Sequence, residues 1–290
     1  MPAIASAWLR YDRTVAMLIA QISDLHIRRP GELAYRRVDT AGHLRRCIAQ
    51  ILAQRPQPDI VVATGDLTDL GLPEEYAHLT EMLATLPMPL YLIPGNHDDR
   101  SALRAAFPQH RYLHHREEFI QYTAPIGPLQ LVALDTVLPG SGGGMLCRSR
   151  LRWLEEQLAA YRHKPVVILM HHPPFATGIE GMDKAGLETA YPLEPIVRRH
   201  PNVERILCGH LHRSIITRFG GTVAVTCPSP AHQVALDLLP DRPAMFIMEP
   251  PGYMLHRWTG EGFVTFSVAV GEFDGPYPFY DEGSTIDSRR

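Results

Sequence analysis

Five short groups of aspartate, asparagine and histidine carry the strongest chemical signal in this sequence. Each group directly follows a run of apolar, strand-forming residues, of which Met17–Ser23 is the first. Carboxylate and amide oxygens and imidazole nitrogens are ligands for first-row divalent metals, and paired metals activate water against phosphate esters. The groups supply these candidate ligands: Asp24, His26, Asp66, Asn96, His171, His210 and His212.

The spacing of these residues indicates how they would share two metal ions. One residue separates Asp24 from His26, so in an extended segment both side chains would lie on the same face. Gly65 lets the backbone turn before Asp66, which we therefore expect to bridge the ions with one oxygen on each. The expected sets are Asp24, Asp66, His26 and His212 for one ion, and Asp66, Asn96, His171 and His210 for the other.

The charge of such a site favours an anionic substrate. Two divalent ions bring four positive charges, Asp24 and Asp66 remove two, and a hydroxide between the ions leaves a net charge of about +1. That bridging hydroxide would be the nucleophile that attacks the phosphate. His97 stands beside a predicted ligand without being needed as one, so we expect it to protonate the leaving group.

Each group alone is weak evidence for a metal site. Gly-Asp and Asn-containing segments are common at turns, and a histidine pair before prolines can simply begin a loop. All five groups nevertheless occur in one chain, and each follows an apolar strand. A shared metal site explains this joint occurrence better than five separate turns do.

Segments with a helical spacing of apolar residues lie between the metal-binding groups. We predict helices at Thr40–Gln54, Glu74–Leu86 and Leu151–Tyr161. Such alternation is typical of an α/β protein with a parallel sheet, whose ligands bind at the carboxyl ends of the strands. A second series of strands predicts a second sheet packed on the first: Leu129–Thr136, Gly221–Cys227, His232–Leu238, Ala244–Met248, Tyr253–Trp258 and Phe263–Val270.

The five groups, which span residues 18–212, resemble the motifs of the calcineurin-like metallophosphoesterases. The resemblance implies a sandwich of two mixed β-sheets flanked by helices, a four-layer α/β/β/α fold. It also implies a dinuclear site that holds divalent or trivalent Fe, Mn, Zn or Co on the ligands named above, with His97 as the proton donor. Further segments are similar to class III cyclic nucleotide phosphodiesterases and bacterial glycerophosphodiesterases: Gly65–Thr68, His171–Pro174 with Gly178 and Met182-Asp183, and Pro228–Gln233.

We therefore predict a phosphoric diester hydrolase that acts on small diesters, either cyclic nucleotides or glycerophosphodiesters. A phosphomonoesterase with the same two metals is the first alternative. A monoester carries an extra negative charge and would favour additional cations at the rim, but the loop Pro173–Tyr191 contains only Lys184 against Glu180, Asp183 and Glu188, which favours diesters. Arg148, Arg150 and Arg152 could supply another cation. A non-catalytic scaffold is the second alternative, which the complete ligand set disfavours.

Two long loops are expected to shape the rim of the site and to set substrate choice. The loops are Val137–Arg150 and Pro173–Tyr191, and both contain several glycines. We predict that Phe175 and Met182 offer an apolar face to a base and that Asp183 accepts hydrogen bonds from substrate hydroxyls.

Composition limits the partners of the chain. A formal charge of −3 without a basic stripe argues against long nucleic acid, and the absence of a long apolar run or signal peptide predicts a cytoplasmic protein without a membrane partner. We expect one metallophosphoesterase domain over residues 17–271, after an N-terminal extension of residues 1–16. The C-terminal tail of residues 272–290 is rich in aromatic residues, which suggests a subunit contact in a homo-oligomer.

Overall fold

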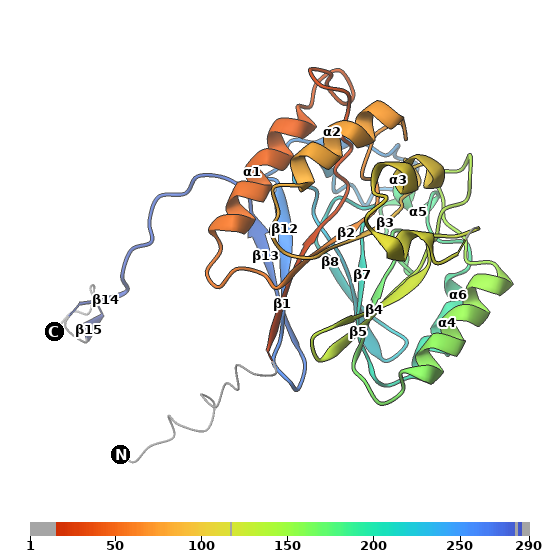
Figure 1. The fold of residues 1–290 in the computed structure, drawn as a ribbon. Helices are drawn as coiled ribbons and strands as arrows, with labels where there is room; N and C mark the ends of the chain where they lie inside the picture. Colours follow the sequence, from red (N-terminus) through yellow and green to blue (C-terminus); the bar gives the residue numbers. More distant parts are fainter. Residues whose placement is uncertain (1–15, 117, 282–283, 286–290) are drawn as a thin grey trace, which may run out of the picture.

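The computed structural model describes residues 16–116, 118–281 and 284–285 of the 290-residue chain. Two mixed β-sheets pack face to face, and helices cover the outer face of each sheet (Figure 1). This arrangement confirms the four-layer fold predicted from the sequence. Residues 1–15 of the predicted extension lie outside the described residues, as does part of the predicted tail.

The first sheet consists of three neighbouring parallel strands and, beside them, an antiparallel pair. Its order is β13-β12-β1-β2-β3, with β12 antiparallel to both of its neighbours. Helices α1 and α2 cover its outer face (Figure 1). The bounds are β1 (Met17–Ile22), α1 (Thr40–Ala53), β2 (Ile60–Thr64), α2 (Pro73–Leu83), β3 (Leu90–Ile93), α3 (Arg100–Ala106), β12 (Gly252–Trp258) and β13 (Phe263–Ala269).

The second sheet has the order β4-β5-β6-β7-β9-β8, with parallel strands from β5 to β9. Helices α4 and α6 pack on its outer face (Figure 1). No helix in the described part of the chain is long and apolar enough to span a bilayer. The bounds are η1 (Arg111–His114), β4 (Tyr122–Ile126), β5 (Leu129–Ala133), α4 (Arg148–Ala160), β6 (Val166–Leu169), α5 (Glu180–Asp183), α6 (Ala190–Arg198), β7 (Val203–Cys208), β8 (Ile215–Phe219) and β9 (Thr222–Thr226). Two short pairs of strands lie outside both sheets. They are β10 (Gln233–Val234) with β11 (Phe246–Ile247), and β14 (Tyr280–Asp281) with β15 (Ser284–Thr285).

Strand β6 shows why the strands next to the metal-binding groups are apolar throughout. Val167 and Leu169 belong to the core between the two sheets, whereas Val166 and Ile168 belong to the core beneath α4 and α6. Because successive side chains point to opposite faces and both faces are buried, every residue of the strand must be apolar.

The second sheet exists as predicted, and the predicted strands Leu129–Thr136 and Gly221–Cys227 belong to it as β5 and β9, but the other predicted strands do not. The predicted strands Tyr253–Trp258 and Phe263–Val270 complete the first sheet, and β6 and β7 belong to the second. The prediction of a strand over His232–Leu238 is wrong beyond Gln233–Val234, since Leu236 and Leu238 leave the sheet and are each 62% exposed. Pairing between distant segments leaves no local sequence signal, which is why the sequence could not assign strands to sheets.

Candidate metal centre

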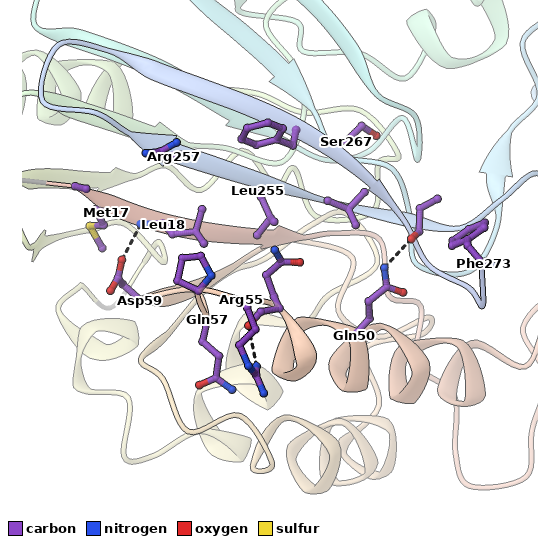
Figure 2. Close-up of a pocket in the computed structure, with 16 residues that line it drawn as sticks. Met17, Leu18, Gln50, Arg55, Gln57, Asp59, Leu255, Arg257, Ser267 and Phe273 are labelled. Carbon is purple, nitrogen blue, oxygen red and sulfur yellow. Dashed lines mark hydrogen bonds between the residues drawn. The ribbon is translucent and has the colours of Figure 1, made fainter. Parts of the chain in front are cut away.

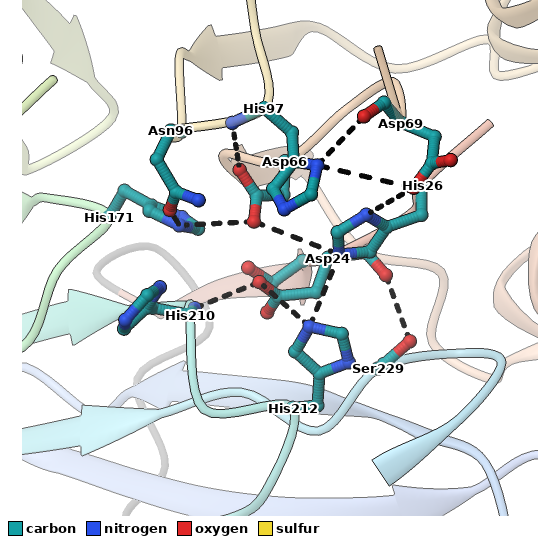
Figure 3. Close-up of polar contacts among 12 residues, drawn as sticks. Asp24, His26, Asp66, Asp69, Asn96, His97, His171, His210, His212 and Ser229 are labelled. Atoms are coloured by element: carbon teal, nitrogen blue, oxygen red, sulfur yellow. Dashed lines mark hydrogen bonds and ion pairs between the residues drawn. The ribbon is translucent and has the colours of Figure 1, made fainter. Parts of the chain in front are cut away.

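All predicted metal ligands meet at one end of the sandwich (Figure 3). They follow the carboxyl ends of β1, β2 and β3 in the first sheet and of β6 and β7 in the second. Within each sheet, backbone bonds hold the strand ends together, from Asp24 N to Gly65 O at 3.0 Å and from Gly209 N to His171 O at 3.0 Å. The backbone N of His210 also donates to Asp24 Oδ1 at 2.8 Å, so one predicted ligand ties the two sheets together.

Glycines permit this close approach of the strand ends. Gly65 has a φ of +95°, as its predicted turn before Asp66 requires, and a Cβ there would lie 2.5 Å from His171 Nδ1. A Cβ on Gly209 would lie 2.1 Å from Ser23 Oγ on the other sheet. Any side chain at either position would therefore push the two sheets apart.

The predicted pair Asp24 and His26 does converge, but not for the reason that the spacing suggested. Their φ values are 55° and 45°, so the segment is not extended and both residues adopt the left-handed conformation. His210 and His212 do the same, with φ values of 70° and 50°. Two left-handed residues with one residue between them, rather than the alternation of a strand, bring each pair of side chains to the centre.

The first predicted ligand set forms one compact group. Asp24, His26, Asp66 and His212 each offer an atom, and these atoms all lie within 4.8 Å of one another. His26 Nε2 lies 3.7 Å from Asp66 Oδ2, and His212 Nε2 lies 3.7 Å from Asp24 Oδ1. The two Nε2 atoms of His26 and His212 are only 3.2 Å apart.

The second predicted set lies on the other side of Asp66. His171 Nε2 is 3.4 Å from Asp66 Oδ2 and 3.1 Å from Asn96 Oδ1, and the His171 and His210 rings are 5.2 Å apart. Asp66 Oδ2 thus faces both sets, whereas Oδ1 accepts a hydrogen bond from the backbone N of His97 at 2.9 Å. Oδ2 is the Asp66 oxygen nearest to His26 and to His171, and a bridge with one oxygen on each ion stays a prediction.

Unsatisfied buried atoms show that this donor set fits cations. Among the described residues, neither Asp24 Oδ2 nor His210 Nε2 has a hydrogen-bond partner, although both are buried. A buried polar atom without a partner costs about 1–3 kcal/mol, which a coordinated cation would remove. The mixture of imidazole nitrogens with carboxylate and amide oxygens suits first-row transition metals.

The predicted histidine ligands are oriented through their outer ring nitrogens. When Nδ1 is held by an oxygen, Nε2 is left facing the centre, which is a common arrangement around protein-bound metals. Such an oxygen partner is observed for His26, His171 and His212, and none of these three partners was predicted from the sequence as part of the site. The contacts are His26 Nδ1 to Asp69 Oδ1 at 3.2 Å, His171 Nδ1 to Thr64 O at 2.8 Å and His212 Nδ1 to His232 O at 3.1 Å.

Charges inside the site shift several pKa values. Burial, with help from the Asp66 charge, raises the pKa of Asp24 to about 6. Burial opposes ionisation of Asp66 too, but the charge of His171 and its hydrogen bond hold the pKa of Asp66 well below its usual range. The Asp66 carboxylate in turn outweighs burial and raises the pKa of His171 to about 9. The centre of the site therefore favours a positive charge.

His97 lies beside the predicted ligands, and its role as a proton donor stays a prediction. Its side chain is 34% exposed, and its ring lies 4.6 Å from that of His26 (Figure 3). Nδ1 donates to the backbone O of Asp69 at 2.7 Å, which leaves Nε2 for a substrate. Asp69 therefore positions both His26 and His97. Its place three residues after Asp66 is the sequence feature from which this positioning role could have been inferred.

His172 lies beside two predicted ligands but has another role. Its Nδ1 is 2.8 Å from Thr136 Oγ1, and its Nε2 is 3.1 Å from the backbone O of Gly142. Both nitrogens are occupied, so neither is left for a metal. His172 instead anchors the predicted rim loop Val137–Arg150 to the second sheet.

Asp98 ends the Gly-Asn-His-Asp segment and braces the metal-binding loops. Its buried carboxylate accepts hydrogen bonds from the backbone N of Gly95 at 2.9 Å and of Leu67 at 3.0 Å. The Tyr76 hydroxyl donates to it at 2.8 Å. Asp98 thereby fixes the segments that carry Asp66 and Asn96 relative to each other.

The two predicted rim loops contact each other. Gly144 N donates to Gly186 O at 3.0 Å, and Glu188 N donates to Gly144 O at 2.9 Å, so the loops form one unit. The Asp183 carboxylate accepts from Thr177 N and Gly178 N at 2.8 Å, which closes its own loop.

The other two predicted substrate contacts lie in the same loop as Asp183. Phe175 packs against the core of the second sheet, and Met182 lies half-buried in α5. Contacts of these three residues with a substrate stay a prediction, and Asp183 and Phe175 already have structural roles.

Comparisons with known proteins agree with this geometry. Residues 17–214 match the family described as Calcineurin-like phosphoesterase. The chain is 40% identical to a probable glycerophosphodiester phosphodiesterase of Arcobacter nitrofigilis, over 93% of this chain and 100% of that protein. It is 29% identical to the 3′,5′-cyclic adenosine monophosphate phosphodiesterase of Escherichia coli K12, over 73% and 75% of the two chains. Its fold is similar to a dimetal phosphatase from Danio rerio, with a TM-score of 0.61, 16% identity, and coverage of 88% of this chain and 99% of that one.

Proposed function

Because this chain belongs to the family of calcineurin-like phosphoesterases, we propose that it is a phosphoric diester hydrolase that uses two metal ions. The observation that carries the proposal is Asp66 Oδ2, which lies 3.7 Å from His26 and 3.4 Å from His171 and so faces both ligand sets. The proposed ligands are Asp24, His26, Asp66, Asn96, His171, His210 and His212.

Glycerophosphodiesters are the first substrate class in this proposal. The relative from Arcobacter nitrofigilis, named for that activity, aligns over its whole length with this chain at 40% identity. The relative named for cyclic adenosine monophosphate aligns over 73% of this chain at 29% identity. Cyclic nucleotides are therefore the second class.

The roles of the side chains follow from their positions. Two bound ions supply an activated water and neutralise the charge that develops on the phosphate. Asp66, Asn96 and the surrounding histidines hold those ions, while Asp69 orients His26 and His97. His97 in its protonated form then donates from Nε2 to the leaving oxygen, since the backbone O of Asp69 already occupies Nδ1.

The surroundings of the predicted cations support a diester over a monoester. Arg150 is 4% exposed and its Nη1 lies 3.8 Å from Asp135 Oδ1, so it is not offered to a substrate. Lys184 Nζ is paired with Glu180 Oε1 at 2.8 Å. The positive charge is therefore already compensated at these two positions, whereas Arg148 and Arg152, the other two predicted cations, are exposed, so the support for a diester rests on Arg150 and Lys184.

Three further features complete the proposal. The donor set suits Fe, Mn, Zn or Co, and the supply of metal decides among them. The catalytic domain covers residues 17–271, and the enzyme acts in the cytoplasm, as the sequence predicts.

The first test of this proposal is metal content. Asp66→Ala removes the shared ligand and Asn96→Ala removes one oxygen donor, so both variants should lose bound metal, measured by plasma mass spectrometry, together with diester hydrolysis. His163→Ala, an exposed histidine after α4, is the matched control and should keep both. Full activity and unchanged metal in either ligand variant would refute the assignment.

The second test concerns the substrate. Metal-loaded protein is assayed with glycerophosphocholine, cyclic adenosine monophosphate and glycerol 3-phosphate, which represent the three classes. We expect the highest kcat/KM for glycerophosphocholine. A higher value for the monoester than for both diesters would show that the alternative function is correct.

A further inference from the structure

A large apolar groove lies at the end of β1 opposite to the metal centre. Its volume is about 1380 Å³, and it runs between the strands β1, β12 and β13 and the last turn of α1 (Figure 2). Nothing in the proposed reaction uses this surface. The apolar side chains that line it are Met17, Leu18, Leu255, Phe266, Val268 and Phe273.

The charged residues of the groove are mostly basic. Arg55 and Arg257 line it, and Asp59 is the acidic residue in its lining. The Asp59 carboxylate accepts a hydrogen bond from the backbone N of Leu18 at 2.7 Å, so it is already engaged by a backbone N–H within the groove. The Arg55 guanidinium is engaged as well, since its Nη1 donates to the backbone O of Leu52 and of Gln54 at 2.8 Å. The groove therefore suits a segment mainly through its apolar lining.

A segment rich in aromatic side chains leaves the molecule at the edge of the groove. We call residues Glu272–Asp281 the arm; Figure 1 shows that it runs away from the sandwich to the hairpin of β14 and β15. Four aromatic side chains of the arm are exposed, which is costly in water unless another surface covers them. They are Phe273 at 67%, Tyr277 at 69%, Phe279 at 84% and Tyr280 at 64%.

The arm is acidic, and the lining of the groove contains two arginines and one aspartate. The arm contains Glu272, Asp274 and Asp281 and no lysine, arginine or histidine. The groove is also bordered by β13, which is the edge strand of the first sheet. An extended segment can bind beside such an edge while its side chains enter the apolar lining.

The direction of the arm favours the groove of another copy over its own. Gln50 fixes the start of the arm, since its Nε2 donates to Ala269 O at 2.8 Å and its Oε1 accepts from Gly271 N at 3.2 Å. Pro276 and Pro278 favour an extended chain, and at about 3.3 Å per residue the arm reaches roughly 30 Å from the body.

We propose that the arm of one copy binds the groove of a second copy, and that the second copy returns the same contact. Such a reciprocal exchange closes a two-fold symmetric dimer, because each copy offers one arm and one groove. The exposed aromatic residues of the arm are then buried against Phe266, Val268 and Leu255.

The first experiment measures the mass of the metal-loaded protein by light scattering. The full chain should be a dimer or a multiple of it, and a chain that ends at Asp274, which keeps Phe273 in the lining of the groove, should be a monomer. Phe266→Arg, in the groove, should weaken association about tenfold or more, the loss that removal of an aromatic anchor causes. Val264→Arg lies on the same exposed side of β13 but outside the groove, and should associate normally. An unchanged mass of the shortened chain would overturn the proposal.

A mixing experiment separates exchange between copies from other occupants of the groove. The shortened chain has a groove but lacks most of the arm, and the Phe266→Arg chain has an arm with a damaged groove. Neither should dimerise alone, but together they should form a one-to-one complex.

If the groove were filled by the chain's own arm or by residues 1–15, no mixed complex would form and the proposal would be wrong. Circular dichroism melting of both chains checks that they are folded. Hydrolysis per chain should stay unchanged, because the metal centre lies at the other end of β1.

Discussion

At the scale of single residues, the metal centre consists of side chains on an unfavourable backbone. Asp24, His26, Asp66, His210 and His212 have φ values between 45° and 70°. The left-handed conformation costs a residue other than glycine about 1–2 kcal/mol. The hydrogen bonds of the surrounding loops hold these residues in place, and a bound cation would compensate part of the cost.

The role of His97 can be tested through the leaving group. His97→Ala should slow hydrolysis of an alkyl diester such as glycerophosphocholine by about 10²- to 10⁴-fold, because an alkoxide leaves poorly without a proton. Hydrolysis of bis(4-nitrophenyl) phosphate should fall much less, since nitrophenolate needs no proton to leave. The measurement is kcat/KM for both substrates; equal losses would exclude His97 as the proton donor.

At the scale of elements, the sequence predicted best what local pattern determines. The helix α1 over Thr40–Ala53 begins and ends within one residue of its prediction, because its apolar spacing and the Asp39 cap are local signals. The assignment of β12 to the first sheet depends on pairing between Met17 and Trp258, which no local pattern encodes. The helix α6 over Ala190–Arg198 was missed, since it contains Pro195 and follows a glycine-rich loop.

The candidate site shows the same division between local and distant signals. The proposed ligands stand out in the sequence because each of their five groups follows a strand, whereas His172 and His232 could not be given roles. What distinguishes them is the set of oxygens that surrounds each ring, and those oxygens come from other parts of the chain.

The rim loops offer a matched pair of glycine substitutions. A Cβ on Gly144 would lie 2.5 Å from the His172 ring, whereas a Cβ on Gly142 would meet its nearest neighbour, Ala185 Cβ, at 3.8 Å. Gly144→Ala should therefore displace the rim and change the ratio of kcat/KM between a glycerophosphodiester and a cyclic nucleotide. Gly142→Ala should leave that ratio unchanged. Metal content should be normal in both variants, and equal behaviour of the two would argue against control of substrate choice by this rim.

The strand β12 contains a buried histidine that should make stability depend on pH. His256 Nε2 lies 2.9 Å from Gln21 Oε1, and burial, followed by the charge of Arg205, lowers the pKa of His256 to about 3. In the unfolded chain this histidine has a pKa of about 6.5, so it takes up a proton before the folded form does as the pH falls. The contribution of neutral His256 to stability is therefore complete above pH 6.5 and is lost progressively below it.

The change in stability between pH 7.5 and pH 5 measures this effect. Urea unfolding of the wild type should show a loss that is about 2 kcal/mol larger than in His256→Gln, because 1.5 pH units below 6.5 correspond to that free energy. Other buried histidines contribute equally to both proteins and cancel in the comparison. Identical losses would mean that His256 is not buried in its neutral form.

At the scale of the whole molecule, the metal centre joins two sheets that otherwise meet only through apolar packing and a few polar contacts. Asp24, His26, Asp66 and Asn96 follow strands of the first sheet, and His171, His210 and His212 follow strands of the second. The core between the sheets contains side chains from both, such as Ile22 and Leu169. Metal bound at the proposed centre would therefore hold together parts of the chain that unfolding separates.

Removal of metal should lower the melting temperature of the whole domain. At a free metal concentration of about 1,000 times Kd, each site adds about 4 kcal/mol of stability. Calorimetry of metal-free protein with and without added Mn²⁺ should show this as a rise in Tm. Asp66→Ala should melt at one temperature in both conditions, and a normal rise in that variant would place the bound metal elsewhere.

The same division of ligands between two sheets sets the order of events during protein synthesis. Asp24 and His26 leave the ribosome early, but His212 emerges much later, and β13, which completes the first sheet, emerges only with Ala269. Translation proceeds at about 5–20 residues per second, so the early ligands wait roughly 10–40 s for their partners. A nascent chain can therefore hold no finished metal centre. Its metal must be acquired at the very end of translation or after release, when the concentration of free metal around the completed chain decides which ion is captured.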